Sequence, residues 1–387
     1  MNCRLLNCGY VSLVDCAPLV IAKTLGFAEE EGIALNLLRQ PSWAALRDLL
    51  AMGHLDAAHM LAPMPVAMSL GLSGQHVQTD ALMVLSINGT VIGTSAALAD
   101  KMRGAGWKGG FQDPIGTRAA LISVSDKPVR VGVPFPYSMH RLLFSYWMGD
   151  AAARFKLVTM PPHLMADAVA AGDLDVFCVG EPWGSVAVNS GTAELILPGA
   201  AIWQFAPEKV LGVRRSWASE HPETTGALMR AIYRAAYWLD RPENHGLAAE
   251  ILSRSDHLDL PDDAIDRALT GEILPVLGAA PVKVPNFLRF NIGAANFPWR
   301  SQAGWIGAQI AALHGLSPSE IARSAATCFR PDLFRAHIAP LGVDLPMTSS
   351  KPEGSMTDHG AIASQRGQLI LGPDAFFDGK ICELPPA

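Results

Sequence analysis

Apolar and polar positions along the chain switch between two periods, one typical of strands and one typical of helices. Near the start, residues 4–11 and 34–38 have the short apolar or alternating pattern of strands. Residues 19–25 and 43–52 have the pattern of helices, and Ser42 is suited to cap the second of them. This β-α-β-α order predicts a mostly parallel sheet with helices on its faces.

The same plan recurs in the middle of the chain. Residues 129–133 predict a strand, and a helix is expected to begin near Ser138 after a turn that contains proline. Another strand is expected from Val210, and the chain beyond it is chiefly helical. In the first connection of the chain, Asp15 is suited to cap the turn before the first helix.

This order of elements fits two lobes better than two consecutive domains. We expect one lobe to contain residues 1–92 and 212–346, and a second lobe, residues 93–211, to be inserted into it. The crossings would lie near residues 88–93 and 209–212, and both contain glycine, which lets a hinge absorb backbone rotation. Residues 347–387 are expected to form a loop and a C-terminal tail.

Composition narrows the class of protein. The chain has 387 residues, of which 50% are hydrophobic and 17% charged, as in a soluble α/β protein. Its net charge is -6, and no run of Lys and Arg exceeds a dipeptide. The electrostatic surface that nucleic-acid binding requires is therefore not indicated, and we expect no direct nucleic-acid partner.

Cysteine usage and the first residues bear on location. The six cysteines include no CxxC pair and no cluster with zinc-ligand spacing, which favours reduced thiols. The opening MNCRLLNCGYVSLVDC lacks the form of a signal peptide. The most apolar later stretch, MLAPMPVAMSLGL, has two prolines and is too short to cross a bilayer. We therefore expect a cytoplasmic protein without a membrane partner.

Several strings, taken together, carry a family resemblance over nearly the whole chain. They are DCAPLVIAKTLGF, SWAALRD, PMP, FPYSMHRLLFSYW, GEPWG, PEKVLGVR, ANFPWRSQAGW, RPDLFRAH and FFDGK. Their order resembles that of the nitrate and bicarbonate solute-binding proteins of ABC transporters. The resemblance implies an α/β fold of the type II periplasmic-binding-protein kind, with two lobes, a ligand cleft and two hinge crossovers. It implies no cofactor and no catalytic activity.

Because we expect the protein in the cytoplasm, the chain resembles, within that family, the cytoplasmic nitrate/nitrite sensors of the NasS kind. These proteins hold an RNA-binding antiterminator of the ANTAR type, NasT-like, inactive until the anion binds. The sequence is therefore interpreted as that of a cytoplasmic nitrate/nitrite sensor that releases such a partner. The alternative is the receptor of a nitrate ABC transporter. An enzyme on the same fold is disfavoured, since no nucleophile with a base at plausible spacing is present.

The resemblance also assigns candidate ligand-binding residues by position. Trp43 stands in SWA, His140 in the FP…H…YW string, and Lys209 in PEK. His59 stands just before PMP, where the family usually has Gln. Gly89, at the first crossing, is a candidate backbone N–H donor.

These residue types suit nitrate, a planar monoanion whose three oxygens only accept hydrogen bonds. Trp43 and His140 are expected at helix N-termini, where free N–H groups and the helix dipole favour an anion. Lys209 adds the formal charge, and a lysine here favours nitrate or nitrite over bicarbonate, whose O–H needs an acceptor.

Each residue also has an ordinary structural role open to it. Trp43 fits an interface aromatic, His140 a helix cap, and Lys209 a solvated surface charge. His59 fits a core or hydrogen-bonded histidine slightly better than a ligand.

Overall fold

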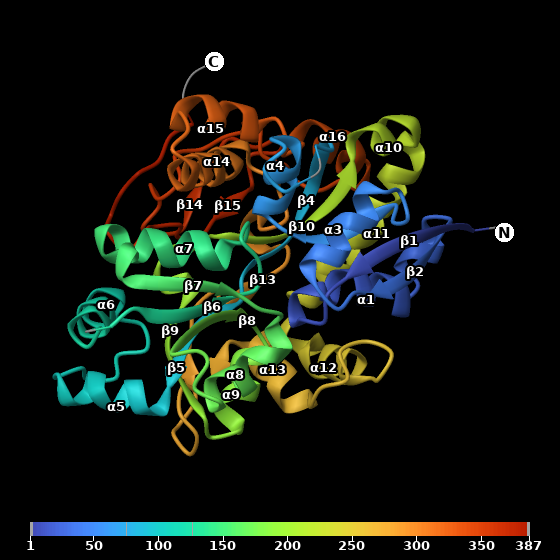
Figure 1. The fold of residues 1–387 in the computed structure, drawn as a ribbon. Helices are drawn as coiled ribbons and strands as arrows, with labels where there is room; N and C mark the ends of the chain where they lie inside the picture. The colour runs from blue at the N-terminus through green and yellow to red at the C-terminus, as the bar shows by residue number, and fades with distance from the viewer. Residues whose placement is uncertain (1–2, 75, 126, 385–387) are drawn as a thin grey trace.

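The structure is a computed structural model that describes residues 3–74, 76–125 and 127–384. It contains two α/β lobes, each built around one sheet, with helices on the sheet faces (Figure 1). The predicted α/β class with two lobes is confirmed. Within the described residues, no helix combines the length and the apolar character that crossing a bilayer requires.

The larger lobe is built on a six-stranded sheet of order β13-β4-β10-β3-β1-β2. Its strands are β1 (Arg4–Tyr10), β2 (Ile33–Arg39), β3 (Ala57–Leu61), β4 (Thr79–Asn88), β10 (Pro207–Arg214) and β13 (Leu288–Arg289). Its helices are η1 (Val14–Cys16), α1 (Ala17–Thr24), α2 (Phe27–Glu30), α3 (Trp43–Ala51), α4 (Pro63–Ser69), α10 (Arg215–Glu220), α11 (Pro222–Leu239), η6 (Ile292–Ala294), α14 (Arg300–His314), α15 (Pro318–Ala326), α16 (Pro331–Ile338) and η7 (Ala339–Leu341).

The smaller lobe is built on a five-stranded sheet of order β7-β6-β8-β5-β9. Its strands are β5 (Thr90–Ser95), β6 (Val129–Val133), β7 (Phe155–Thr159), β8 (Val176–Gly180) and β9 (Ala193–Pro198). Its helices are α5 (Ala96–Gly104), α6 (Pro114–Ser123), α7 (Met139–Met148), η2 (Gly149–Arg154), η3 (Pro162–Leu164), α8 (Met165–Ala170), α9 (Trp183–Asn189) and η4 (Gly199–Ala201).

Both sheets are mixed, whereas the sequence pattern predicted mostly parallel sheets. Strand β1 pairs in parallel with β2 and β3, and β6 pairs in parallel with β7 and β8. Strands β5 and β10 run antiparallel to their neighbours. The reason is topological, because each of these strands enters its sheet directly from the other lobe and not through a covering helix.

The two crossings between the lobes differ in how closely they match the prediction. The first lies where β4 ends and β5 begins, at Asn88 and Gly89, which have positive φ values of 57° and 82°. The second lies before β10, in residues 199–206, because β10 already belongs to the larger sheet. The boundary drawn at residue 211 therefore falls inside a strand of the larger lobe. Gly212 is not at a crossing, because it pairs with Ala58 of β3 and Ala81 of β4 inside the larger sheet.

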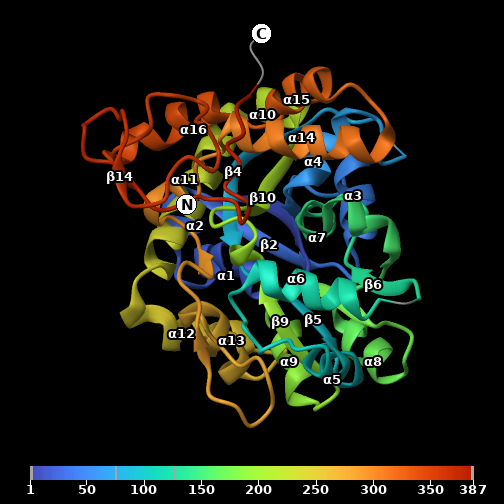
Figure 2. The same cartoon turned by 90° about the vertical axis from the view of Figure 1, so that its left-hand side faces the viewer.

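A third segment from the larger lobe reaches the smaller one. It contains η5 (Pro242–Asn244), α12 (His245–Ser253), α13 (Asp262–Thr270), β11 (Glu272–Ile273) and β12 (Val282–Lys283). Figures 1 and 2 both show α13 beside the smaller lobe. The Leu195 amide donates to Pro275 O at 2.8 Å, and Gln112 donates to Lys283 O at 3.0 Å. Residues 212–346 are thus not confined to one lobe.

The C-terminal segment is packed onto the body of the protein, although a loop and tail were expected. It includes β14 (Gly360–Ala361) and β15 (Ile370–Leu371). Buried Glu353 accepts from Ser301 at 2.6 Å and from Lys351 at 2.6 Å. Phe376 stacks on Trp203 with ring centroids 4.7 Å apart. The sequence pattern could not predict these contacts, because the residues that form them lie far apart along the chain.

The local signals near the start of the chain are largely confirmed. Ser42 caps α3 by accepting from the Ala45 amide at 3.2 Å, and Ser138 caps α7 in the same way. Asp15 is different, because it makes no side-chain cap and turns instead toward the interface between the lobes. A buried partner of opposite charge outcompetes a local cap at this position.

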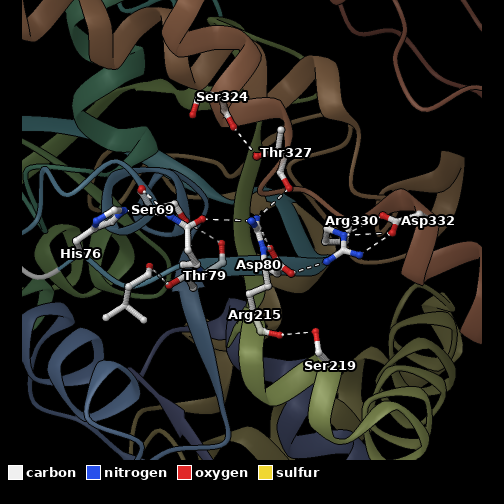
Figure 3. Close-up of polar contacts among 12 residues, drawn as sticks. Ser69, His76, Thr79, Asp80, Arg215, Ser219, Ser324, Thr327, Arg330 and Asp332 are labelled. Carbon is white, nitrogen blue, oxygen red and sulfur yellow. Dashed lines mark hydrogen bonds and ion pairs between the residues drawn. The ribbon is translucent and has the colours of Figure 1, made fainter.

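A buried ionic cluster attaches the helical region to the larger sheet (Figure 3). Asp80, at the start of β4, is fully buried and lies 2.7 Å from Arg215 and 2.6 Å from Arg330. Arg215 begins α10, and Arg330 precedes α16 and also pairs with Asp332. One carboxylate therefore holds together three segments that are distant in sequence.

Replacing Asp80 with alanine should strongly destabilise the fold, since it leaves two guanidinium groups without their shared partner. We expect Asp80→Ala to lower the free energy of unfolding by about 3–5 kcal/mol, toward the lower end because both arginines are partly exposed. Urea denaturation measures this. Asp100→Ala, which removes an exposed partner of Arg103, is the control and should change stability by less than about 1 kcal/mol. Equal effects of the two substitutions would contradict the role given to Asp80.

Candidate functional site

Four of the residues predicted to bind a ligand meet in one buried cluster between the lobes. Trp43 begins α3, His59 lies in β3, His140 is in the first turn of α7, and Lys209 lies in β10. Each is at most 1% exposed. The rings of Trp43 and His59 are 5.5 Å apart, and the Lys209 ammonium lies 5.5 Å from the Trp43 ring. Segments from both lobes therefore contribute to one site.

The cluster also contains two carboxylates that the sequence reasoning did not assign to it. Lys209 Nζ lies 2.7 Å from Asp15 Oδ2 and 2.9 Å from Glu208 Oε1. His59 Nε2 lies 2.9 Å from Asp15 Oδ1, and His140 Nδ1 lies 3.2 Å from Glu208 Oε1. Both carboxylates are at least 98% buried. The signal for them was their position in DCAP and PEK, next to residues already assigned.

A bulge in β10 explains how two consecutive residues reach the same site. Side chains of successive strand residues normally point to opposite faces of the sheet. The register of β10 against β4 shifts on both sides of Lys209. Such an irregularity turns side chains out of their regular alternation. Glu208 and Lys209 can therefore contact each other in the cluster.

The charges of the cluster affect each other's protonation. Burial acts to raise the pKa of Asp15, but Lys209 and His59 lower it to about 2. Burial raises the pKa of Glu208 to about 7, against the opposing effect of Lys209. Burial would lower the pKa of Lys209, but Asp15 and Glu208 raise it. Lys209 is therefore a cation at neutral pH, and its charge is matched by Asp15.

The two histidines are neutral at neutral pH in this environment. Burial lowers the pKa of His59, with Asp15 acting in the opposite direction. Burial and the charge of Lys209 lower the pKa of His140 well below its ordinary value. Each ring can therefore donate one N–H and accept at its other nitrogen.

Several buried polar atoms of the cluster, donors and acceptors, have no hydrogen-bond partner among the described residues. These are Trp43 Nε1 and both ring nitrogens of His59 and of His140, whose close approaches to Asp15 and Glu208 lack hydrogen-bond geometry. Glu208 Oε2 also lacks a partner. Buried polar groups are normally hydrogen-bonded, and leaving one unpaired costs about 1–3 kcal/mol. So many unpaired groups beside one ammonium are the mark of a binding site for a small, hydrogen-bonding ligand.

Gly89 does not offer a free donor, although it was a candidate. Its N–H donates to Phe287 O at 2.5 Å, and its carbonyl accepts from the Glu181 amide at 3.1 Å. Both the N–H and the carbonyl of Gly89 are therefore hydrogen-bonded within the protein. A different glycine lies against the cluster, because an added Cβ on Gly180 would be 3.5 Å from Asp15 Oδ2 and 3.8 Å from His140 Nε2.

Direct contacts between the lobes close over the cluster. Trp183 Nε1 donates to Ser12 O at 2.8 Å, and the Val14 amide donates to Glu181 O at 2.9 Å. Tyr137 donates to Leu72 O at 2.7 Å. Near Ser12 a groove of about 420 Å³ opens to solvent, lined by Ser12, Arg39, Gln40, His163, Trp183 and Leu260. The cluster itself is closed, so ligand exchange requires the lobes to separate.

A metal ion does not fit the composition of this site. In the part of the chain that the structure describes, no group of three or more His, Cys, Asp or Glu side chains is arranged to hold a metal ion. The ammonium of Lys209 occupies the space between the two carboxylates, where a cation would otherwise bind.

Removing the Lys209 charge should destabilise the protein in a pH-dependent way. Lys209→Met leaves Asp15 buried without its main partner, and we expect a loss of about 3–5 kcal/mol in the free energy of unfolding at pH 8. The loss should shrink as the pH falls, since the orphaned carboxylates can then bind protons.

Urea denaturation at pH 8 and pH 5 tests this expectation. Lys283→Met, at an exposed lysine paired with Glu272, is the matched control and should have little effect at either pH. A loss for Lys209→Met that is equal at the two pH values would show that charge is not its cause.

Comparison with known proteins agrees with this fold. The model of the NMT1-like family matches residues 2–253. The nitrate import ATP-binding protein NrtC of Synechocystis is 33% identical over 344 residues, which are 87% of this chain and 50% of NrtC. The bicarbonate transport ATP-binding protein CmpC of Synechococcus elongatus is 34% identical over 312 residues, 79% of this chain and 45% of CmpC. The chain thus spans about half the length of these two relatives.

A third relative, whose name describes a binding protein, is covered over a larger share of its own length than NrtC and CmpC. The nitrate/nitrite binding protein NrtA of Synechocystis is 32% identical over 272 residues, 67% of this chain and 59% of NrtA. Its crystal structure superimposes with a TM-score of 0.83 and 26% identity, covering 98% of this chain and 95% of that one. From the family model and these relatives we conclude that the chain belongs to the NMT1-like family, in its NrtA-like group of solute-binding proteins.

Proposed function

We propose that the protein binds nitrate or nitrite between its two lobes, in the cluster of Trp43, His59, His140 and Lys209. The observation that carries the proposal is the set of buried, unpaired N–H donors around the Lys209 ammonium. Nitrate has only acceptor oxygens in one plane, so it can receive the indole N–H, two imidazole N–H groups and the ammonium. Hydrogen bonds to a charged partner contribute about 1.5–3 kcal/mol each.

The two carboxylates have a positioning role in this proposal. Asp15 and Glu208 hold the Lys209 ammonium from two sides and reduce the freedom of its long side chain. Asp15 Oδ1 also lies 2.9 Å from His59 Nε2. A donor set that is ordered before the ligand arrives loses less entropy on binding.

The relatives support an anion of this size. Their names assign nitrate, nitrite or bicarbonate to them. Bicarbonate is the second candidate ligand, because the unpaired Glu208 Oε2 is an acceptor that could take its O–H. Lys209 by itself therefore does not decide between the two anions, although the sequence pattern suggested that it would.

We expect nitrate and nitrite to stabilise the protein and sulfate not to do so, since sulfate would bring two negative charges instead of one into a closed site that holds a single ammonium. Thermal unfolding with each anion measures this, and a ligand at a hundred times its Kd raises the free energy of unfolding by about 2.7 kcal/mol.

Trp43→Phe keeps an aromatic ring but removes the indole N–H donor, so it should weaken nitrate binding about ten- to a hundredfold in calorimetric titration.

Trp299→Phe is the matched control for this substitution. Trp299 is also fully buried, and its Nε1 also lacks a partner, but it lies outside the cluster. Its replacement should leave nitrate affinity unchanged. Sulfate stabilisation equal to that by nitrate, or equal losses for the two tryptophan variants, would contradict the assigned site.

Closure of the lobes around the anion could serve two roles, that of a transport receptor and that of a sensor. The names of NrtC and CmpC assign them to nitrate import and bicarbonate transport, which favours a receptor that delivers the anion to a membrane permease. The second candidate is a cytoplasmic sensor, in which closure changes the outer surface and releases a NasT-like antiterminator. The interlobe contacts at Trp183 and Tyr137 would form or break in either case. Nitrate can release a partner only if that partner binds the open form more tightly.

The sensor role predicts a complex with the antiterminator that forms without nitrate and weakens when nitrate is added. By reciprocity the partner would weaken nitrate binding by the same factor, typically about 5- to 150-fold. Copurification and titration of the two proteins measure both effects. A complex that stays intact at saturating nitrate and nitrite would rule out the sensor role and leave the receptor role.

A further inference from the structure

The anion site contains two carboxylates for one cation, and this excess negative charge has a consequence for ligand uptake. We propose that the site takes up its monoanion together with one proton, and that Glu208 carries the proton. The inference deepens the proposed function and rests on it. It makes Glu208 a residue that selects the ligand by its own protonation state.

The contacts of Glu208 place it at the centre of the charged cluster. Its Oε1 lies 2.9 Å from Lys209 Nζ and 3.2 Å from His140 Nδ1, and its Oε2 has no partner among the described residues. The residue is 1% exposed. The titratable and charged groups around it are Lys209 on its own strand, Asp15 from η1, His140 from α7, Cys178 from β8 and, through Asp15, His59 from β3.

The balance of charges requires a proton when the ligand is an anion. With Glu208 ionised, one ammonium faces two carboxylates, and a monoanion would bring the closed site to a net charge of two negative units. Uncompensated charge is strongly disfavoured where water is excluded. Protonation of Glu208 removes one of these charges. It also turns an acceptor that would repel nitrate into an O–H that can donate to it.

Glu208 is better suited to take the proton than its neighbours. Lys209 and His59 hold the pKa of Asp15 at about 2. Burial lowers the pKa of both histidines, and the adjacent ammonium lowers that of His140 further. Burial raises the pKa of Glu208 to about 7, and a nearby bound anion would raise it further.

The direction of the pH dependence follows from these values. Well below pH 7 the free protein already holds the proton on Glu208, so binding takes up almost none and the Kd hardly changes. Above pH 7 the free protein is ionised there, and binding must take up a proton. The Kd for nitrate should then rise up to tenfold per pH unit, until the pH reaches the raised pKa of the complex.

Calorimetric titration with nitrate tests the proposal in the wild-type protein. Titrations at pH 6 and pH 8.5, each in two buffers with different ionisation enthalpies, report the number of protons taken up. We expect a value near zero at pH 6 and a value approaching one at pH 8.5, with a Kd at least tenfold higher at pH 8.5.

Glu208→Gln assigns the proton to this residue. An amide keeps a donor at the same place and cannot ionise, so the variant should bind nitrate with a Kd that hardly changes between pH 6 and pH 8.5, without proton uptake. Glu181→Gln is the matched control. Glu181 is equally buried, its pKa is also raised to about 7 by burial, and it accepts from the Ser185 amide outside the cluster. This control should keep the pH dependence of the wild type.

The outcomes separate this inference from the proposed function. Nitrate binding with a pH-independent Kd and no proton uptake in the wild type overturns the proton coupling but leaves the function standing. Persistent coupling in Glu208→Gln overturns the assignment to Glu208. Nitrate that fails to bind at any pH overturns both.

If Glu208→Gln does not fold, infrared difference spectroscopy of the wild type at pH 8.5 decides the assignment. Nitrate should produce the carbonyl band of a newly protonated carboxyl group in the wild type and in Glu181→Gln. Absence of that band would refute the proposal.

Discussion

The Lys209 ammonium, held between Asp15 and Glu208, is the interaction on which the rest of the site depends. A cation can be buried in this protein because carboxylates accompany it, and Asp15 also lies 2.9 Å from His59 Nε2. The contact also joins η1 to β10, two segments separated by almost two hundred residues. Disturbing this pair therefore affects both the interlobe surface and the larger sheet.

The position of β10 in the chain topology explains why Glu208 and Lys209 lie in the site. Because β10 enters the larger sheet directly from the smaller lobe, its first residues lie at the boundary between the lobes. The bulge around Lys209 then brings Glu208 and Lys209 into the same cluster. A strand with regular alternation would have sent one of these charges into the opposite face of the sheet.

Stability and binding make opposite demands on this region. Paired charges and tight interlobe contacts stabilise the closed arrangement, whereas Trp43, His59 and His140 keep buried donors without partners. Natural proteins tolerate such unpaired groups chiefly where function requires them. At Asp80, by contrast, two arginines share one buried carboxylate, so that charge is paired.

The sequence by itself determined the local elements and part of the site. Period and capping chemistry placed β1, β2 and β6 and the starts of α3 and α7 closely, because these signals act over a few residues. The family strings brought Trp43, His59, His140 and Lys209 into one hypothesis, and the structure places them together. Only the tertiary structure decided the partners of Asp15 and Glu208, the engagement of the Gly89 N–H, the strand direction of β5 and β10, and the packing of the C-terminal segment. Each of these depends on groups that are far apart along the chain and meet only once the lobes are folded, so no local pattern could contain them.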